Sequence, residues 1–338
     1  MALIRVAING FGRIGRNAFK LAMANPALEV VAINDLTDTA TLAHLLRHDS
    51  NYGEYHAEVV AGDGFITVAD KKVQVTAIKE PNKLPWDKLG VDVVIESTGR
   101  FTEYEDLKLH LAAGAKKVVL SAPEKDDTHG DTYVIGANEH QLKSDHKIIS
   151  NASCTTNCIA PVMAVLEQEL GVAKSLMTTV HSYTASQMLQ DGPAKDLREA
   201  RAAAQNIVPT TTGAAIAAAL TVPSLKGHFD GLSVRVPSPV VSLSDITFVA
   251  KRKTSIEEVN KILRHAAATS HRGIIEVTDQ ELVSVDFKGN PHSAIVDAKL
   301  TNVVDGDLVK VVAWYDNEWG YSNRLVEMVE LAGNSIKK

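Results

Sequence analysis

The first 150 residues alternate short apolar runs with segments of helical periodicity. The apolar runs are rich in β-branched residues, which is typical of strands buried on both faces of a sheet. They lie at residues 3–8, 29–33, 91–95, 118–120 and 147–149. Helical spacing is found between them at residues 13–24, 39–46 and 104–113. This alternation predicts a doubly wound parallel sheet, with a hairpin over residues 65–68 and 72–76 inserted into it.

The pattern changes after Ser150. Helices are predicted at residues 155–169, 213–220 and 255–268. Longer candidate strands lie at residues 175–180, 232–236, 242–249, 273–277, 293–297 and 308–315. Strands grouped in this way, with helices set apart, predict an α+β domain with a largely antiparallel sheet. Residues 182–205 show little periodicity, and a loop of that length in a compact domain is usually functional.

These periodicities together predict two domains, which agrees with a length of 338 residues. The first domain is expected to span residues 1–152 and the second residues 153–317. Apolar spacing at residues 321–332 predicts a final helix, at about 318–338, that returns to the first domain.

Composition narrows the possible functions. With 41 acidic and 35 basic residues, the formal net charge of −6 gives no bulk electrostatic attraction to nucleic acid or to an anionic membrane. No apolar run reaches the length of about 18 residues that a membrane-spanning helix needs. The first residues lack the features of a signal peptide, and two cysteines cannot build a disulfide framework. We therefore expect a cytoplasmic protein in a reducing compartment.

A glycine-rich motif follows the first predicted strand and opens the first predicted helix. Gly10, Gly12 and Gly15 have the spacing in which one glycine permits a tight turn, one lets a pyrophosphate approach and one packs helix on strand. The helix N-terminus offers N–H groups to that pyrophosphate. Asp35 ends the second predicted strand, where a carboxylate binds a ribose 2′-hydroxyl and repels a 2′-phosphate. A turn without a ligand is the alternative, but the combination predicts a Rossmann domain that binds NAD rather than NADP.

Two cysteines lie where the last strand of the first domain joins the next helix. Cys154 is expected in the first helical turn, where the helix dipole stabilises a thiolate and lowers the thiol pKa. Cys158 is expected to pack as a small apolar residue one turn later. His181 ends a predicted strand and is a candidate base, although spacing alone leaves structural roles open for both Cys154 and His181. A nucleophilic thiol beside a dinucleotide site predicts oxidation of an aldehyde through a thiohemiacetal.

No metal site is indicated. The chain contains no C-x-x-C, and two cysteines with scattered histidines match no zinc spacing. His44 and His48 are four residues apart on a predicted helix, but no glutamate follows His44, so the H-E-x-x-H motif is missing. We therefore expect that the protein uses no metal.

Five longer motifs occur in one order along the chain. They read NGFGRIGR at residues 9–16, SNASCTTNC at 150–158, VHSYT at 180–184, IVPTTTGAA at 207–215 and WYDNE at 314–318. This set resembles the phosphorylating, NAD-dependent glyceraldehyde-3-phosphate dehydrogenases of the bacterial type, and the resemblance runs from Ile4 to the final helix. It implies glycolytic oxidation and phosphorylation of D-glyceraldehyde 3-phosphate to 1,3-bisphosphoglycerate, with NAD and inorganic phosphate. It also implies a homotetramer.

The resemblance implies roles for individual residues. Cys154 matches the nucleophile that forms the thiohemiacetal and the thioester, and His181 matches the base that activates it and assists hydride transfer. The site for inorganic phosphate matches Ser153, Thr155, Thr212 and Gly213. The site for the phosphate of the substrate matches Thr184 and Arg235. Positions around NAD match Phe11, Gly12, Arg13, Ile14, Asp35, Lys79, Thr98, Gly99, Phe101, Ser121, Asn317 and Tyr321.

The chain departs from the family pattern at three positions. Lys79 stands where an arginine is common near the adenine, and this change is expected to weaken cofactor contacts slightly. Glu199 stands where a basic residue is frequent, and Val240 stands where the family often has asparagine. None of the three is part of the predicted catalytic pair.

Two other functions stay open. Erythrose-4-phosphate dehydrogenases share the nucleophile and the cofactor, but they usually lack the threonine run that residues 210–213 contain. A non-catalytic NAD-binding redox sensor would use Cys154 as a peroxide-sensitive thiol, because exposed thiolates oxidise readily. The presence of a base and of two phosphate sites favours the catalytic function. The expected partners are small-molecule substrates and further copies of the chain, without nucleic acid or membrane.

Overall fold

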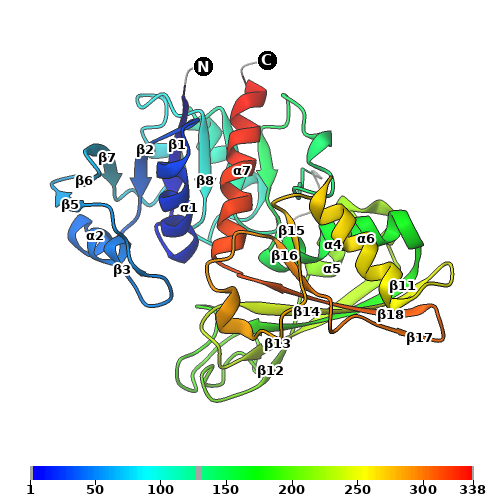
Figure 1. Ribbon diagram of the computed structural model, residues 1–338. Helices are drawn as coiled ribbons and strands as arrows, with labels where there is room; N and C mark the ends of the chain where they lie inside the picture. Colours follow the sequence, from blue (N-terminus) through cyan, green and yellow to red (C-terminus); the bar gives the residue numbers. More distant parts are fainter. Residues whose placement is uncertain (1–2, 126–130, 337–338) are drawn as a thin grey trace. The chain divides into compact units, whose positions relative to one another are not determined.

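The computed structural model describes residues 3–125 and 131–336, which form two compact units (Figure 1). The first unit comprises Met1–Tyr133, His140–Ala152 and Ser322–Lys338, and the second comprises Val134–Glu139 and Ser153–Tyr321. The predicted segments 1–152 and 318–338 include residues 1–2, 126–130 and 337–338, which lie outside the described residues.

An eight-stranded sheet forms the centre of the first unit, in the order β10-β9-β8-β1-β2-β7-β6-β5. Strands β10 to β7 of this order pair in parallel, whereas β7, β6 and β5 pair antiparallel. The predicted doubly wound parallel sheet is therefore confirmed, and the predicted hairpin extends it through β7. The strands are β1 (Ile4–Asn9), β2 (Leu28–Asn34), β5 (Val59–Gly62), β6 (Phe65–Val68), β7 (Lys71–Thr76), β8 (Val93–Glu96), β9 (Lys117–Leu120) and β10 (Ile148–Ser150).

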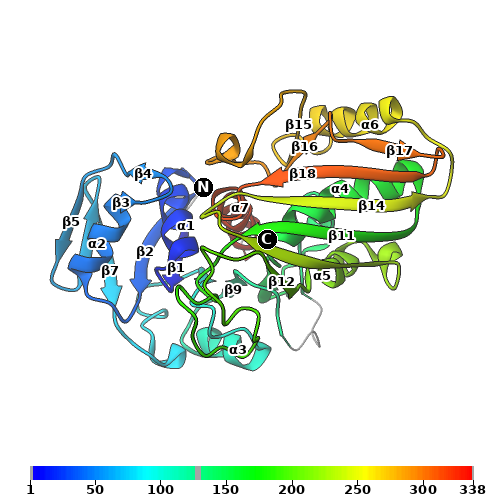
Figure 2. The same ribbon diagram turned by 90° about the horizontal axis from the view of Figure 1, so that it is seen from below.

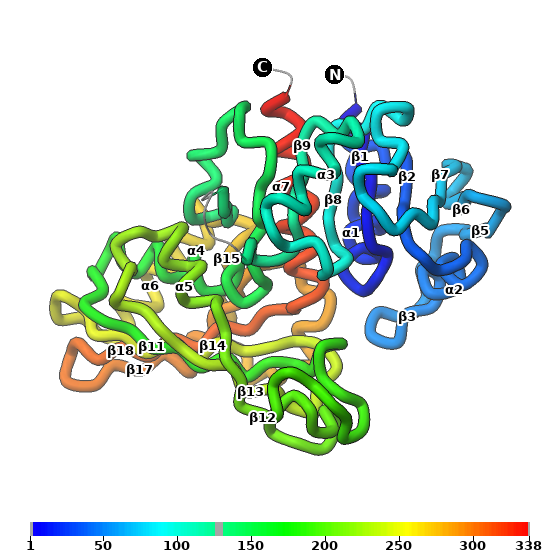
Figure 3. The backbone as a smooth tube through the Cα atoms, turned by 180° about the vertical axis from the view of Figure 1, so that it is seen from behind, coloured from blue at the N-terminus to red at the C-terminus, as the bar shows by residue number. Residues whose placement is uncertain are grey.

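Helices cover both faces of this sheet. Figures 1 and 3 show α1 and α3 on opposite faces, as a doubly wound sheet requires. The last helix, α7, packs closely on β1: a Cβ added at Gly333 would lie only 2.5 Å from the side chain of Ile4. The helices are α1 (Arg13–Ala24), α2 (Thr39–Arg47), α3 (Tyr104–Ala112) and α7 (Trp319–Ile336), with short 3-10 turns at Pro81–Lys83 and Glu139–Gln141 and a small ribbon of β3 (His48–Asp49) and β4 (Gly53–Glu54).

A second eight-stranded sheet organises the second unit, in the order β12-β13-β11-β14-β18-β16-β15, with β17 paired to β18. The pairs β11–β13 and β15–β16 are parallel and the other pairs are antiparallel, so the predicted sheet is found in a mixed form. The strands are β11 (Val172–Ser182), β12 (Val208–Thr211), β13 (Phe229–Val236), β14 (Ser242–Ala250), β15 (Ile275–Thr278), β16 (Ala294–Asp297), β17 (Asn302–Val304) and β18 (Leu308–Tyr315).

Helices cover only one face of the second sheet (Figures 1 and 2). Strand β11 shows the result: Met177, Thr179 and His181 are buried, whereas Leu176 is 66% exposed. Successive side chains of a strand point to opposite faces, so His181 lies on the helix-covered face. The helices are α4 (Cys154–Leu170), α5 (Ala214–Thr221) and α6 (Ile256–Ala268), with 3-10 turns at Pro223–Leu225 and Ser284–Phe287.

The long segment between β11 and β12 contains no helix or strand over its described residues 183–207, as its lack of periodicity predicted. Its own polar contacts hold it together. Asp191 accepts hydrogen bonds from the Arg201 side chain and the Ala202 backbone at 2.8 and 2.9 Å. The segment presents Leu189 and Leu197 to solvent, with 79% and 82% of these residues exposed.

Candidate active site

The three glycines of the first turn have three different environments. Gly10 has a φ of +92°, and a Cβ there would lie 2.6 Å from the backbone nitrogen of Thr98. A Cβ at Gly15 would lie 2.1 Å from the carbonyl oxygen of Gly10. Gly12 begins α1 as its N-cap, and nothing lies within 4 Å of a Cβ placed there. The first glycine therefore permits the turn, the last permits close packing, and Gly12 leaves the N-terminus of α1 open to a ligand.

A cavity of about 610 Å³ opens in the first unit beside this turn. Of the residues that the sequence assigned to NAD, Gly12, Asp35, Lys79, Thr98 and Phe101 line it. In open α/β sheets, ligands bind at the carboxyl ends of the parallel strands. This rule could have identified several further residues that line the cavity. These are Asn9, Gly10, Asn34, Leu36, Ile78, Glu80, Pro81, Asn82, Ser97, Arg100 and Leu109.

Backbone donors hold the Asp35 carboxylate in place. Its Oδ2 accepts a hydrogen bond from the Phe11 N–H at 2.8 Å, and its Oδ1 accepts one from the Thr37 N–H at 3.0 Å. A carboxylate fixed in this way needs no rearrangement to accept a ribose hydroxyl, because acceptor sites remain on both oxygens.

Other residues assigned to NAD do not line the cavity. Phe11 is buried, with its ring edge-on to Phe19, and Arg13 pairs with Asp49 at 2.5 Å. Ile14 lies in the first turn of α1, Gly99 follows Thr98 with a φ of +69°, and Ser121 follows β9. Asn317 and Tyr321 belong to the second unit, where Oδ1 of Asn317 accepts hydrogen bonds from Ser182 and Ser242 at 3.0 and 3.1 Å.

Cys154 and His181 meet in the second unit. Cys154 is the first residue of α4, which Ser153 caps by accepting the Thr156 N–H at 3.0 Å. His181 lies near the end of β11, and its Nε2 is 3.4 Å from the Cys154 Sγ. A thiol and an imidazole at this distance can exchange a proton, as a nucleophile and its base must.

The protonation of the pair differs from the sequence-based expectation. Desolvation raises the pKa of the Cys154 thiol above its ordinary value, although Arg235 and hydrogen bonds from Thr155 act in the opposite direction. The N–H groups at the start of α4 lower this pKa, as predicted, but desolvation raises it more, so the net shift is opposite to the predicted one. Desolvation, and then the nearby Arg235 charge, lowers the pKa of His181 to about 3. His181 is thus neutral at neutral pH, with a lone pair on one ring nitrogen.

Two groups compete for Nδ1 of His181. Nδ1 of His181 lies 2.7 Å from the Ser182 carbonyl oxygen and 2.5 Å from Nη1 of Arg235. Arginine only donates and a carbonyl oxygen only accepts, so the Arg235 contact requires the histidine proton on Nε2 and the Ser182 contact requires it on Nδ1. If Arg235 turns to an anion instead, Nδ1–H donates to the Ser182 carbonyl and Nε2 offers its lone pair to Cys154.

The residues assigned to inorganic phosphate lie at the N-termini of two neighbouring helices. Ser153 and Thr155 flank the start of α4, while Thr212 and Gly213 immediately precede α5. These helix ends approach each other, because the Thr156 hydroxyl lies 3.5 Å from the Ala214 carbonyl oxygen. Two helix N-termini and several hydroxyl groups suit an anion. Thr184, assigned to the other phosphate, is bonded through its hydroxyl to Ser186 at 3.0 Å.

Comparison with known proteins identifies the family. Residues 4–104 match the glyceraldehyde 3-phosphate dehydrogenase NAD binding domain, and residues 153–317 match the C-terminal domain of the same enzyme. A glyceraldehyde-3-phosphate dehydrogenase of Geobacillus stearothermophilus is 51% identical over 326 residues, which cover 96% of this chain and 97% of that protein. The chain belongs to the glyceraldehyde-3-phosphate dehydrogenase family.

Other members of the family show similar agreement. The Mycobacterium tuberculosis glyceraldehyde-3-phosphate dehydrogenase is 52% identical over 340 residues, covering 98% of this chain and 99% of that protein. Glyceraldehyde-3-phosphate dehydrogenase 2 of Synechocystis is 50% identical over 338 residues, covering 99% and 100%. The predicted family, the NAD-dependent dehydrogenase class and the Rossmann fold of the first unit are thereby confirmed.

Sequence reasoning missed a buried tyrosine that supports the site of this family member. The Tyr315 hydroxyl lies 2.9 Å from the hydroxyls of both Thr155 and Thr179. It thus connects the first turn of α4 to the same face of β11 that carries His181. Tyr315 belongs to the WYDNE motif, which was the available signal, but only Asn317 of that motif had been assigned a role.

The three departures from the family pattern have separate environments. Lys79 lines the cavity of the first unit. Glu199 accepts a hydrogen bond from Thr210 at 3.4 Å within the second unit. Val240 is buried, and its carbonyl oxygen accepts the Ser238 hydroxyl at 3.0 Å. Among the described residues, none of these three side chains forms a hydrogen bond with Cys154 or His181.

Within residues 3–125 and 131–336, no group of three or more histidine, cysteine or acidic residues is placed to hold a metal ion. In the same part of the chain, no helix is both long and apolar enough to cross a membrane. Cys158 is fully buried, and desolvation raises its pKa, so it has the environment of a packing residue.

Proposed function

We propose that the chain catalyses oxidation and phosphorylation of D-glyceraldehyde 3-phosphate to 1,3-bisphosphoglycerate, with NAD and inorganic phosphate. The observation that carries the proposal is the contact of 3.4 Å between Cys154 Sγ and His181 Nε2 at the start of α4. A thiol, a neutral base and neighbouring anion sites are what thioester chemistry on a phosphorylated aldehyde requires.

His181 begins the reaction by taking the thiol proton on Nε2, and the resulting thiolate attacks the aldehyde carbon to form a thiohemiacetal on Cys154. The imidazolium gives its proton to the thiohemiacetal oxygen, which the backbone N–H of Cys154 also stabilises, and His181 is then neutral again. NAD supplies the hydride acceptor when it is bound. His181 then takes the hydroxyl proton as the carbon is oxidised, which leaves a thioester on Cys154.

Inorganic phosphate attacks this thioester, releases the acyl phosphate and returns the thiolate. Ser153, Thr155, Thr212 and Gly213 are proposed to bind that phosphate, since they surround two helix N-termini. Thr184 and Arg235 are proposed to bind the phosphate of the substrate. Arg235 would then leave Nδ1 of His181, which lets the histidine act as the base.

The residues present fit NAD in the first unit. Gly12 leaves open space at the N-terminus of α1, and Asp35 faces the cavity with its carboxylate already oriented. We propose that residues 1–152, with the helix at about 318–338, hold the cofactor, and that residues 153–317 carry the acyl chemistry. The other proposed cofactor residues are Phe11, Arg13, Ile14, Lys79, Thr98, Gly99, Phe101, Ser121, Asn317 and Tyr321.

We also propose a homotetramer in the cytoplasm. The family resemblance implies the tetramer, and the helix-free face of the second sheet supports it by exposing Leu176 and Leu232, which are 66% and 45% exposed. Exposed apolar side chains of this kind are common where subunits meet. Two free cysteines agree with a reducing compartment.

The proposal is tested by following NADH formation from glyceraldehyde 3-phosphate, with and without inorganic phosphate. We expect phosphate-dependent reduction of NAD and little reduction of NADP. Cys154→Ser should abolish turnover and leave NAD affinity intact, while Cys158→Ala serves as the matched control and should stay active. Turnover of erythrose 4-phosphate alone would favour the sister enzyme, and NAD binding without any turnover would favour a redox sensor.

A further inference from the structure

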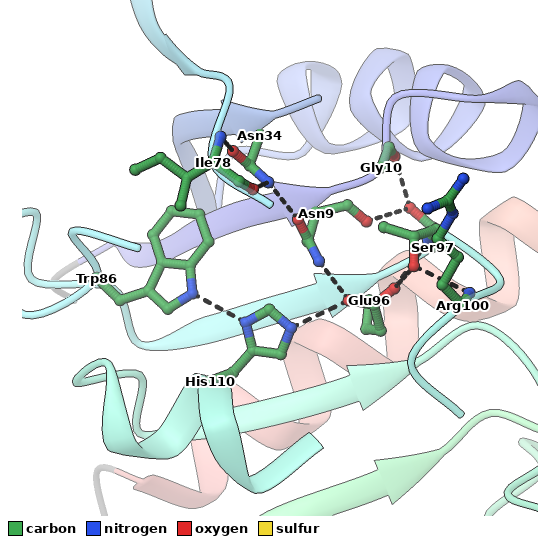
Figure 4. Close-up of polar contacts among 10 residues, drawn as sticks. Asn9, Gly10, Asn34, Ile78, Trp86, Glu96, Ser97, Arg100 and His110 are labelled. Atoms are coloured by element: carbon green, nitrogen blue, oxygen red, sulfur yellow. Dashed lines mark hydrogen bonds and ion pairs between the residues drawn. The ribbon is translucent and has the colours of Figure 1, made fainter. Parts of the chain in front are cut away.

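A chain of hydrogen-bonded groups connects residues that line the cavity of the first unit with fully buried residues behind them (Figure 4). At its centre is Glu96, the last residue of β8, whose side chain is fully buried. The Oε2 atom of Glu96 lies 2.5 Å from Nδ2 of Asn9 and 3.0 Å from Nε2 of His110. The Oε1 atom accepts the backbone N–H of Thr98 at 2.8 Å and its hydroxyl at 2.5 Å.

The backbone of Ile78 fixes the direction of the hydrogen bonds at one end of the chain. Asn34 donates from Nδ2 to the Ile78 carbonyl and accepts the Ile78 N–H at Oδ1, both at 2.9 Å. The orientation of the Asn34 amide is therefore set, so that Nδ2 also donates to Oδ1 of Asn9 at 2.7 Å. Asn9 must then turn its own Nδ2 toward Glu96.

The indole of Trp86 fixes the direction at the other end. Its Nε1–H can only donate, and it lies 3.0 Å from Nδ1 of His110. Nδ1 therefore accepts, and the proton of the neutral imidazole is on Nε2, where it is donated to Glu96. Trp86 and His110 are both fully buried, so water does not supply an alternative partner.

Both ends of the chain thus direct a donor to Glu96, and its carboxylate accepts four hydrogen bonds, from Asn9, His110 and, twice, Thr98. Four hydrogen bonds stabilise a buried carboxylate well. A side chain that carries an N–H or O–H at this place would instead point it at another donor. Glu96 also joins two segments of the cavity wall, because both Asn9 and Thr98 line it.

The same two segments are in direct contact around the glycine turn. The Ser97 hydroxyl donates to the Gly10 carbonyl at 2.8 Å, and the Ser97 N–H donates to the Asn9 carbonyl at 2.8 Å. A small displacement of residues 97–98 would therefore change the shape of the turn that receives the dinucleotide. The carboxylate is well placed to prevent such a displacement.

We propose that Glu96, with His110 held as its Nε2–H donor by Trp86, is a positioning residue that shapes the NAD cavity through Asn9 and Thr98. The proposal rests on the NAD site proposed above. It assigns to a fully buried carboxylate of the first unit the task of ordering the cofactor site before NAD binds.

The test compares NAD binding by calorimetry in the full-length parent protein and in Glu96→Gln. The glutamine amide has an NH₂ group in place of one carboxylate oxygen. In either of the two orientations of the amide, this NH₂ group faces N–H donors whose hydrogen bonds the carboxylate had accepted. Without one of these hydrogen bonds, NAD binding must also restore the arrangement of residues 97–98, and a cost as large as one hydrogen bond to a charged group raises the Kd for NAD about tenfold to a hundredfold. Glu103→Gln, an exposed carboxylate of the same unit, is the matched control and should leave the Kd unchanged.

Two further measurements separate positioning from general destabilisation. The rate at which iodoacetamide alkylates Cys154 without NAD should be the same in the parent and in Glu96→Gln, since the thiol lies in the second unit. In the double variant Trp86→Phe/Glu96→Gln, His110 is free to move its proton to Nδ1 and to accept from the amide. Part of the lost NAD affinity should therefore return.

A second pair of variants keeps the test decisive if Glu96→Gln does not fold. His110→Gln retains an N–H donor that can reach Glu96, whereas His110→Phe has none. We expect NAD affinity near that of the parent in the first and a clear loss in the second. Equal affinity in the pair, or an unchanged Kd in folded Glu96→Gln, overturns the proposal. Failure of the parent itself to bind NAD would instead overturn the proposed function.

Discussion

Replacing Gly12 by alanine should weaken NAD binding while leaving the fold almost unchanged. Gly12 has φ and ψ of −74° and −156°, which alanine adopts without strain, and a Cβ there meets no atom within 4 Å. Alanine is a poorer N-cap than glycine, so the loss of unfolding free energy should be about 1 kcal/mol or less.

The expected loss of binding follows from the place of the new methyl group. It would occupy the space above the first N–H groups of α1, where the pyrophosphate approaches the backbone. Loss of one hydrogen bond to a charged group costs about 1.5–3 kcal/mol, which is about tenfold to a hundredfold in Kd. Calorimetry with NAD and urea unfolding of the free protein measure the two effects separately.

Gly10→Ala is the contrasting variant. Its positive φ costs about 1–2 kcal/mol in alanine, and contact with the Thr98 backbone adds about 1–3 kcal/mol of overpacking. The sum, about 2–5 kcal/mol, should appear in urea unfolding without any ligand. The reasoning about the turn is refuted if Gly12→Ala binds NAD as the parent does, or if it destabilises the protein as much as Gly10→Ala.

Two further predictions concern the second unit. In Arg235→Gln, loss of the cation raises the pKa of the Cys154 thiol, so the pH profile of its alkylation by iodoacetamide should move to higher pH; an unchanged profile, or one moved to lower pH, would contradict the role given to Arg235. In Tyr315→Phe, the Thr155 and Thr179 hydroxyls both lose their bond to the Tyr315 hydroxyl, while Thr179 keeps its bond to the Leu243 carbonyl. We expect a loss of about 1–3 kcal/mol in urea unfolding, and a change within error would show that the Tyr315 hydroxyl contributes little.

Most of the first unit could be predicted because its signals are local. Buried parallel strands consist of apolar residues in sequence, and the glycine turn carries its chemistry within a few positions. Strand β12 was missed because it contains Pro209, which weakens a strand pattern. The structure shows why proline is tolerated there: β12 is the edge strand of its sheet.

The parts that sequence reasoning could not reach depend on distant residues. Thr155 and Tyr315 are 160 residues apart along the chain, so no spacing rule connects them. The pKa of Cys154 was predicted in the wrong direction because the helix dipole is a local effect, whereas desolvation comes from the folded surroundings. The network around Glu96 likewise joins residues from separate strands, a loop and a helix, and only the fold brings them together.

The pairing of β11 with β13 places His181 directly opposite Arg235 in a parallel ladder that begins with Ser175 and Phe229. Since neighbouring positions of a strand point to opposite faces, one deleted residue within either strand before this point would turn one of the two side chains to the other face. Insertions in residues 183–207 leave the ladder as it is. The pairing of His181 with Arg235 is thus kept when the loop changes in length and lost when either strand does. The loop is therefore the place where the chain can be extended.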